Sequence, residues 1–408
     1  MAWIGLDFGT SNTAAAIVEQ GAPRVITLDS GARTQPTAVF LDGNARKTVF
    51  GQDALDALVD GREGRFMRAL KSVLGTPLMH EVRVLQHERV ALIDLVARFL
   101  EQVRERAETA TGQDFDKVVS GRPVRFHHDP DRHARATADL TAAYHKAGFK
   151  EVRFLPEPEA AAIASGGVSS GLGLVVDIGG GTSDFSVFRG TAGAVDVLAS
   201  HGIRLGGTDF DRLLSLAHVM PLFGMGTEIK AVFGSQTSTA PNAIFHELAT
   251  WEAIPFLYTG EVRRRVVDMA KMAVDQRAFG RLVEVLEHEL GHDVALAVES
   301  GKIGANSGAD AINLGLVERG LSVPLTSGDL THDLSGSVDL IREGAAEAIA
   351  AAGADAADIR KVVMVGGSSL LTAVDTAIRD LLPAAEIERG DVFTAVVDGL
   401  AIAAARAA

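Results

Sequence analysis

An apolar run at the start of the chain leads into Asp7-Phe8-Gly9-Thr10-Ser11-Asn12-Thr13. A second apolar run leads into Asp177-Ile178-Gly179-Gly180-Gly181-Thr182-Ser183-Asp184. Glycines at a tight turn let backbone N–H groups approach phosphate oxygens, and the neighbouring hydroxyl groups add donors. Aspartate is a ligand that hydrated Mg²⁺ prefers. The repetition therefore predicts a duplicated fold that holds a nucleotide between its halves.

The composition excludes several classes of protein. The chain has 408 residues, which is enough for two domains, and 47% of them are apolar. It has no cysteine, so disulfides, thiolate catalysis and cysteine zinc sites are excluded. A net charge of −14 disfavours nucleic acid and anionic membranes as partners. No apolar run reaches the roughly 20 residues of a membrane span, and no basic leader precedes the first strand. We expect a cytoplasmic protein.

Strand-like and helix-like patterns alternate along the chain, which predicts an α/β fold. Hairpins are expected after both glycine-rich loops. Amphipathic or alanine-rich patterns predict helices over 53–59, 65–74, 91–110, 131–147, 157–165, 333–352 and 393–407, and a broken helical stretch over 243–301. Residues 220–242 are rich in Gly, Ser and Thr, and we expect an exposed insertion there.

Six motifs in order carry a resemblance to a known family. The two loops are accompanied by Leu70-Lys71-Ser72-Val73-Leu74-Gly75, Glu157-Pro158-Glu159-Ala160-Ala161-Ala162-Ile163-Ala164, Gly206-Gly207-Thr208-Asp209-Phe210-Asp211 and Val365-Gly366-Gly367-Ser368. Over essentially its whole length, the chain resembles the nucleotide-binding domain of the seventy-kilodalton heat-shock chaperones, DnaK type, in the actin-like ATPase superfamily. An insertion with Ala249-Thr250-Trp251-Glu252 is more similar to the shorter YegD-type members.

The resemblance implies a two-lobed actin-like ATPase fold with duplicated ribonuclease-H-like lobes. Lobe I would comprise residues 1–170 and 393–408, and lobe II residues 171–392. A helical subdomain would insert into lobe II over about residues 212–305.

The resemblance also implies an ATP or ADP clamped with Mg²⁺ between the lobes. The phosphates would be held from lobe I by Gly9, Thr10, Ser11 and Asn12, and from lobe II by Gly179, Gly180, Gly181 and Thr182, with Gly206 and Gly207 beside them. Asp7 and Asp177 would hold the metal through waters. Lys71 would be the catalytic lysine at the γ-phosphate. Glu157 and Asp184 would be the remaining catalytic acids, and Thr182 would act beside them.

On the adenosine side, the resemblance points to Glu299 and Lys302, with Gly366, Gly367 and Ser368 as the wall under the base. Two arginines of the family are replaced here, by Leu370 and Ile303. Packing of the base is therefore expected to be more apolar and less cationic.

The function implied is a slow, Mg²⁺-dependent ATPase that acts as a chaperone-like nucleotide switch. Its partners would be an unfolded or client protein and a nucleotide-exchange partner. The chain ends about one helix after Gly399, so we expect no β-rich substrate domain. Two alternatives stay open: a small-molecule kinase on the same fold, and a non-hydrolysing nucleotide switch or filament protein.

Two histidine motifs carry weaker alternatives. His288-Glu289-Leu290-Gly291-His292 matches the HExxH pattern, which on one helix face binds Zn²⁺ in proteases. A solvated helix face is favoured, because Val298 stands where a third histidine ligand belongs. The cluster from His127 to His133 is expected to be an exposed turn, with Asp131 capping the helix that follows.

Overall fold

The structure is a computed structural model that describes residues 2–29, 31–85, 88–168, 171–191, 194–231, 236–389, 391 and 393–407. The chain forms two compact units, residues 1–207 with 338–408 and residues 208–337. The lobe boundaries expected at residues 170 and 392, and the last residue, 408, lie outside the described residues.

The first unit contains a sheet formed mainly by the N-terminal part of the chain. Its strands run in the order β3-β2-β1-β10-β11, and β4 (Gln35–Pro36) pairs with β2. Its other strands are β1 (Ala2–Phe8), β2 (Asn12–Glu19), β3 (Ala22–Ile26), β10 (Phe115–Arg122) and β11 (Glu151–Pro156). Strand β1 is parallel to β10 and antiparallel to β2. The buried alanines of β2 and the apolar residues of β1 give this sheet an enclosed face.

A second sheet repeats this topology. Its order is β14-β13-β12-β19-β20, and β12 is antiparallel to β13 and parallel to β19. The strands are β12 (Leu172–Ile178), β13 (Ser183–Thr191), β14 (Ala194–Ile203), β19 (Ile359–Val365) and β20 (Glu386–Arg389). In both sheets, three consecutive antiparallel strands are extended, on the side of the first strand, by two later strands that run parallel to it. The expected α/β fold built on a duplicated sheet is confirmed.

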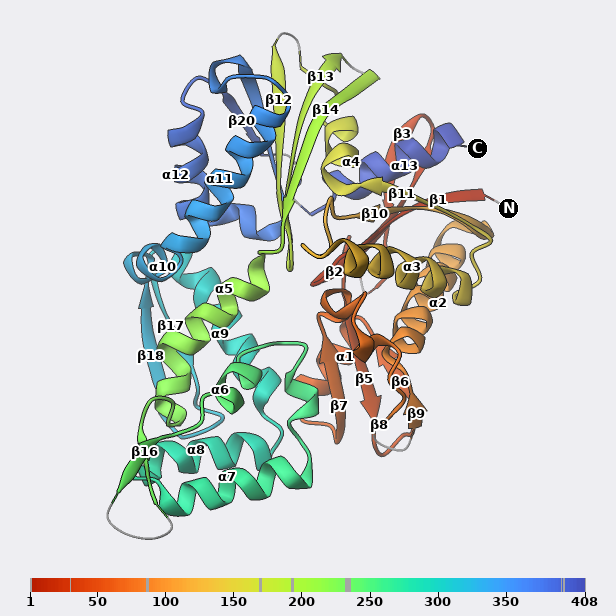
Figure 1. Cartoon of the computed structure of the whole chain (residues 1–408). Helices are drawn as coiled ribbons and strands as arrows, with labels where there is room; N and C mark the ends of the chain where they lie inside the picture. The colour runs from red at the N-terminus through yellow and green to blue at the C-terminus, as the bar shows by residue number, and fades with distance from the viewer. Residues whose placement is uncertain are drawn as a thin grey trace. The chain divides into compact units, whose positions relative to one another are not determined.

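Two helices join the cores of the two sheets. Helices α4 (Glu157–Ala164) and α13 (Ala395–Ala407) lie side by side (Figure 1). A Cβ on Gly399 would lie only 1.8 Å from the carbonyl oxygen of Ala160, so glycine is required at this crossing. One apolar cluster contains Val119 of the first sheet, Val175 of the second, and residues of both helices. The packing of α4 and α13 therefore binds the two sheets into one unit.

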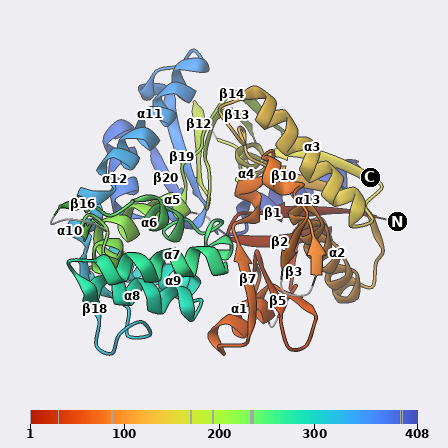
Figure 2. The same ribbon diagram turned by 60° about the horizontal axis from the view of Figure 1, so that its bottom comes forward.

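Other helices cover these sheets. Helices α2 (Leu92–Thr111) and α3 (Pro130–Lys146) pack together beside the first sheet (Figure 2). Helices α11 (Ser335–Ala351) and α12 (Thr372–Leu381) accompany the second sheet (Figure 1). The N-cap of α3 is Asp129, whose carboxylate accepts the backbone N–H of Arg132 at 2.7 Å. The expectation that Asp131 caps this helix is wrong, because Pro130 already occupies the first helical turn.

The helix expected over 65–74 is also wrong. Residues Gly64–Arg68 form strand β7, and a 3-10 turn follows over Leu70–Val73. Strand β7 completes a three-stranded sheet with β5 (Ala38–Asp42) and β6 (Thr48–Phe50), on which helix α1 (Gln52–Val59) packs. The apolar pair at Phe66 and Met67 lies opposite Phe40 and Val39. A short hairpin, β8 (Arg83–Leu85) and β9 (Glu88–Val90), precedes α2.

The second unit is mainly helical. It begins within α5 (Gly207–Leu214), which continues into a π-helical turn over Ser215–Val219. Its other elements are β15 (Glu228–Lys230), β16 (Thr237–Thr239), α6 (Ala243–Leu248), α7 (Gly260–Met272), α8 (Gln276–Glu287), α9 (Gly291–Asn306), β17 (Ala309–Asn313), β18 (Ser322–Thr326) and α10 (Ser327–Asp333). The exposed insertion expected from residue 220 is wrong at its start, since Met220 and Phe223 are fully buried. Residues 232–235 of that insertion lie outside the described residues.

Within the described part of the chain, each helix is either too short or too polar to cross a lipid bilayer.

Candidate functional site

The two glycine-rich loops have the same backbone geometry. In the loop after β1, the N–H of Gly9 donates to the carbonyl of Asn12 at 3.0 Å. In the loop after β12, the N–H of Gly179 donates to the carbonyl of Thr182 at 2.9 Å. Both loops therefore connect the strands of a hairpin through one tight turn, at the same point of the duplicated sheet.

The two loops lie against each other within the first unit. A Cβ on Gly180 would lie 2.5 Å from the hydroxyl oxygen of Ser11, and one on Gly181 would lie 3.2 Å from the hydroxyl of Thr10. Behind the second loop, a Cβ on Gly206 would lie 2.6 Å from the backbone of Gly180. The N–H of Gly207 donates to the carbonyl of Gly179 at 2.9 Å. A side chain at Gly180 or Gly206 would collide with the neighbouring segment, so these glycines allow the three segments to lie close together.

Lys71 and Glu157 form a buried ion pair beside these loops. The Lys71 amine donates to the Glu157 carboxylate at 2.7 Å, and both residues are only 8% exposed. Burial alone would lower the pKa of Lys71, but the carboxyl groups of Glu157, Asp7 and Asp184 outweigh it and raise that pKa. Lys71 therefore carries a fixed positive charge.

Three aspartates share the surroundings of this pair. Burial, followed by the charge of Glu157, raises the pKa of Asp7 to about 7 and the pKa of Asp184 to about 8. The same two causes raise the pKa of Asp177 well above its usual range. Hydrogen bonds from the Val124 backbone, at 2.8 Å, and from Thr182 oppose the rise at Asp184. Such crowded carboxyl groups favour a cation among them.

The segment that carries Lys71 is fixed by side chains from several elements. Asp139 on α3 accepts the N–H of Gly75 at 2.8 Å, and the His127 ring bonds the carbonyl of Leu74 at 2.6 Å. Arg204, after β14, donates to the carbonyl of Ser72 at 3.2 Å and to the other ring nitrogen of His127 at 3.3 Å. Since that nitrogen accepts from a guanidinium, His127 is neutral and protonated at Nε2.

The turn at Gly366, Gly367 and Ser368 packs against the second loop. A Cβ on Gly366 would lie 2.3 Å from the carbonyl oxygen of Ile178, and its φ of 78° favours glycine. The hydroxyl of Ser368 lies 3.5 Å from the carbonyl oxygen of Gly179. The structure thus brings these three predicted residues to the second loop.

Glu299 and Lys302 belong to the second unit, on α9. Lys302 is buried and donates to Asp211 at 2.6 Å, and the indole of Trp251 donates to the same carboxylate at 3.2 Å. Burial raises the pKa of Asp211, and the charge of Glu299 adds to that rise. The Lys302 amine therefore has a carboxylate partner inside its own unit. Ile303 on this helix is 64% exposed.

The donor set at the aspartates suits a hard cation bound through water. Asp7, Asp177 and Asp184 offer carboxylate oxygens, which are the ligands that Mg²⁺ prefers. Among the residues that the structure describes, no three His, Asp or Glu side chains converge closely enough to hold a metal alone. Mg²⁺ commonly keeps several waters and takes further oxygens from a bound phosphate. The residues present therefore fit a magnesium ion that arrives with a nucleotide.

The HExxH sequence does not lie on one helix. Helix α8 ends at Glu287 and α9 begins at Gly291, so the motif spans the turn between them. Glu289 has a φ of 56°, and its carboxylate pairs with Arg263 at 2.6 Å. His288 pairs with Glu284 at 3.5 Å, while His292 is buried. This turn does not provide the helix face that a zinc protease requires.

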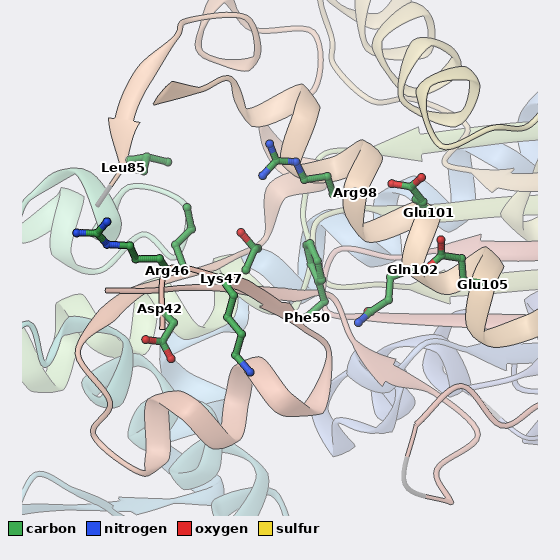
Figure 3. Close-up of a pocket in the computed structure, with 11 residues that line it drawn as sticks. Asp42, Arg46, Lys47, Phe50, Leu85, Arg98, Glu101, Gln102 and Glu105 are labelled. Carbon is green, nitrogen blue, oxygen red and sulfur yellow. The ribbon is translucent and has the colours of Figure 1, made fainter. Parts of the chain in front are cut away.

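A cavity of about 670 Å³ lies elsewhere in the first unit, between α2 and the three-stranded sheet (Figure 3). None of the predicted site residues is among its described lining. Arg98, Glu101 and Glu105 reach it from α2, and Arg46 and Lys47 come from the turn after β5 (Figure 3). With Asp42 also present, the described lining carries equal numbers of acidic and basic side chains.

Sequence reasoning missed the side chains that fix the Lys71 segment. His127 and Asp139 were assigned to an exposed turn and to a plain helix, yet both are buried. A signal for Asp139 was present, because an acid in the apolar stripe of a helix is rarely buried without a partner. No comparable pattern in the sequence pointed to Arg204 or to its contacts with His127 and Ser72.

Comparison with known proteins agrees with this geometry. The model of the family described as Hsp70 protein matches residues 3–235, more than half of the chain. The chain is 33% identical over 240 residues to the chaperone protein HscA homolog of Bordetella pertussis, covering 53% of this chain and 36% of that protein. It is 34% identical over 243 residues to the HscA homolog of Burkholderia mallei, covering 54% of this chain and 38% of that protein.

The matched segment thus spans little more than a third of the length of these curated relatives. Within this chain the match includes both glycine-rich loops, Lys71, Glu157 and Asp184. The family match, the duplicated sheet and the paired loops agree: the chain belongs to the Hsp70 family.

Proposed function

We propose that the paired loops bind the phosphates of ATP with Mg²⁺ and that the site hydrolyses ATP slowly to ADP and phosphate. The observation that carries the proposal is the close approach of Gly180 to Ser11, beside the buried pair of Lys71 and Glu157. Backbone N–H groups and hydroxyls from two hairpin loops, next to a fixed cation, suit a polyanion better than any other ligand.

The residues of the two loops and the buried ion pair each have a role in this proposal. Gly9, Thr10, Ser11 and Asn12 bind the β- and γ-phosphates from one side, and Gly179, Gly180, Gly181 and Thr182 bind them from the other. Lys71 neutralises charge that develops on the transferred phosphoryl group. Glu157 holds the Lys71 amine in place through their 2.7 Å bond and accepts a proton from, or positions, the attacking water.

Asp7 and Asp177 would hold Mg²⁺ through waters, and Asp184 would support those waters. When bound, the ion supplies positive charge to the phosphate oxygens. The aspartates must be ionised for this role, and a divalent cation lowers their raised pKa values.

The cellular role we propose is a chaperone-like nucleotide switch. Its support is membership of the Hsp70 family and similarity to proteins named as HscA chaperone homologues. In this role the ATP and ADP states would differ in their affinity for a client protein, and an exchange partner would replace ADP with ATP.

Release of phosphate from ATP by the purified chain tests the proposal. We expect slow release that requires Mg²⁺ and that added sugars or other small hydroxyl compounds do not increase. Release that appears only with such a compound, together with its phosphorylation, would instead assign the chain as a kinase. Absence of both activities and of ATP binding would overturn the proposal.

A further inference from the structure

Arg204 connects the segment that carries Lys71 to the second sheet. It follows β14 of that sheet, and its guanidinium donates to the carbonyl of Ser72 at 3.2 Å and to Nδ1 of His127 at 3.3 Å. Ser72 is the residue after Lys71, and His127 lies between β10 of the first sheet and α3. One side chain from the second half of the duplicated fold therefore bonds two segments of the first half.

The backbone at Arg204 is anchored on the second glycine-rich loop. The hydroxyl of Ser183, the first residue of β13, is buried and donates to the carbonyl of Leu205 at 2.7 Å. A Cβ on Gly206 would lie only 2.6 Å from the backbone of Gly180. Because Leu205 and Gly206 directly follow Arg204 in the chain, the second loop sets the position from which the guanidinium reaches Ser72.

The turn that accepts this guanidinium needs contacts from outside. Lys71 and Ser72 lie in the 3-10 turn over Leu70–Val73, the Lys71 turn, which follows Ala69 with a φ of 60°. A residue with a side chain rarely adopts that backbone conformation, and it persists only where the surroundings hold it. The bond to the Ser72 carbonyl therefore helps to fix the backbone from which the Lys71 amine reaches Glu157.

His127 can accept from Arg204 only while its ring is neutral. Its Nε2–H donates to the carbonyl of Leu74 at 2.6 Å, which leaves Nδ1 as the acceptor for the guanidinium. A second proton, on Nδ1, would place two donors and two positive charges face to face.

The surroundings of His127 favour the neutral ring. Burial lowers the pKa of His127, and the bond to Leu74 opposes that effect. The groups that face the ring, Arg204 after β14 and Arg132 and His133 on α3, lower the pKa further. The contact with Arg204 is therefore complete at pH 7 and is lost in acid.

We propose that Arg204 and neutral His127 are positioning residues for ATP hydrolysis, which fix the Lys71 turn relative to the second glycine-rich loop. The inference rests on the proposed function, since Lys71 must act on a phosphate held by both loops. In that site the loops bind the phosphates and Arg204 does not, so loss of Arg204 should slow turnover and leave ATP binding nearly unchanged. Displacing a catalytic group by about 1 Å can cost on the order of 100-fold in rate.

Kinetics of the full chain separate positioning from binding. The variants are Arg204→Gln, which removes the charge, and Arg204→Lys, which keeps the charge and can still donate. At pH 7.5 with Mg²⁺ and saturating ATP, we expect Arg204→Gln to lower kcat roughly tenfold and Arg204→Lys to restore most of the rate. The dissociation constant of ATP, measured by calorimetry, should stay within about twofold of the wild type in both variants.

The pH profile tests the role of His127. His127→Gln keeps a donor and an acceptor but does not titrate, and His128→Gln is the control. His128 is exposed, and none of the hydrogen bonds or ion pairs among the described residues involves it. From pH 7.5 to pH 5.5, kcat should fall at least about threefold further in the wild type and in His128→Gln than in His127→Gln. The aspartate cluster titrates in all three proteins, so it does not cause this difference.

Nitrogen-15 spectra of histidine-labelled protein give a readout that needs no activity. The signals that disappear in His127→Gln are those of His127. Without nucleotide at pH 7.5, they should show a protonated Nε2 and an unprotonated Nδ1. Arg204→Gln should raise the pH at which this ring takes up its second proton, because a positive charge beside it has been removed.

Several results would overturn the inference. Wild-type kcat in Arg204→Gln is one, and a loss of ATP affinity as large as the loss of kcat is another, since it would show general damage to the site. Equal falls of kcat with acid in the wild type and His127→Gln, or a ring of His127 protonated at Nδ1 at pH 7.5, would remove His127 from the account. If the wild type hydrolyses no ATP although His127 shows the expected proton at Nε2, the proposed function itself fails and the inference fails with it.

Discussion

Lys71 lies among more carboxyl groups than one lysine can neutralise. Its amine bonds Glu157, while Asp7, Asp177 and Asp184 surround the pair and have raised pKa values. Each of these aspartates is favoured in its neutral form by burial. A bound Mg²⁺ would reverse that preference, so the protonation of this cluster should follow the bound ligand.

The raised pKa of Asp184 predicts that the free protein loses stability as pH rises. The group binds its proton more tightly when folded, so its contribution is complete below the unfolded value near 3.8 and is lost as pH rises to about 8. In Asp184→Asn this contribution does not titrate. Thermal unfolding without Mg²⁺ or nucleotide should therefore show a smaller fall in Tm between pH 5 and pH 8.5 for the variant than for the wild type. Equal falls in Tm for the wild type and the variant would contradict the raised pKa of Asp184.

The same cluster predicts that binding of Mg²⁺ and ATP releases protons at pH 7. The pKa of Asp7 is about 7 and that of Asp184 is about 8, so both carry protons part of the time before binding and must lose them on binding. The observed binding enthalpy should therefore change with the ionisation enthalpy of the buffer. An enthalpy that is the same in phosphate and in Tris buffer would count against this cluster as the metal site.

A single sequence identifies those site residues that lie in recognisable motifs. Lys71 and Glu157 were both predicted, and the structure places them 2.7 Å apart across 86 positions of sequence. The side chains that hold the lysine segment, such as Asp139 and Arg204, could not be predicted. Their role depends on which segments the fold brings together, and no local pattern encodes that.

The glycine-rich loops act as elements, because their glycines set how closely three backbone segments approach. We predict that Gly206→Ala weakens ATP binding by at least about tenfold, since its Cβ would lie 2.6 Å from the Gly180 backbone. Gly280→Ala on α8 is the matched control: a Cβ there meets nothing within 4 Å. Calorimetry with ATP compares the two variants. Similar ATP affinity in Gly206→Ala and Gly280→Ala would show that the close packing of Gly206 on Gly180 does not shape the site.

The start of α3 offers a second test among the elements. Asp129→Ala removes the N-cap and should lower the free energy of unfolding by about 1 kcal/mol. Asp131→Ala lies inside the first turn and should lower it by clearly less, through the helix dipole alone. Denaturant unfolding measures both. A larger effect at Asp131 would reverse the assignment of the cap.

Helices were predicted well where the apolar or alanine-rich pattern extends over many residues, as for α2 and α13. The segment over 65–74 was mistaken for a helix because its strand has only five residues, Gly64–Arg68. Over so few positions a strand and a helix give similar apolar patterns. The segment forms a strand because it pairs with Val39 and Phe40, which lie outside it in the sequence.

At the scale of the whole molecule, the duplication of the sheet explains the duplication of the loops. Each loop follows the first strand of its sheet, and α4 and α13 join the two sheets through a common apolar cluster. The spacing of the loops in the sequence predicted this duplication. For the helical second unit, residues 208–337, the sequence pattern alone predicted only a broken helical stretch over 243–301, and the subdomain expected over about residues 212–305 came from the family resemblance.

The central claim is that the paired loops and Lys71 form an ATP-hydrolysing site. Phosphate release from ATP by the wild type, Lys71→Ala and the exposed-lysine control Lys271→Ala tests it most directly. Lys271 is on α7 and pairs only with nearby Asp268 among the ion pairs described. We predict that Lys71→Ala binds ATP but loses about 100-fold in turnover, while Lys271→Ala keeps the wild-type rate. Wild-type turnover in Lys71→Ala would contradict the account.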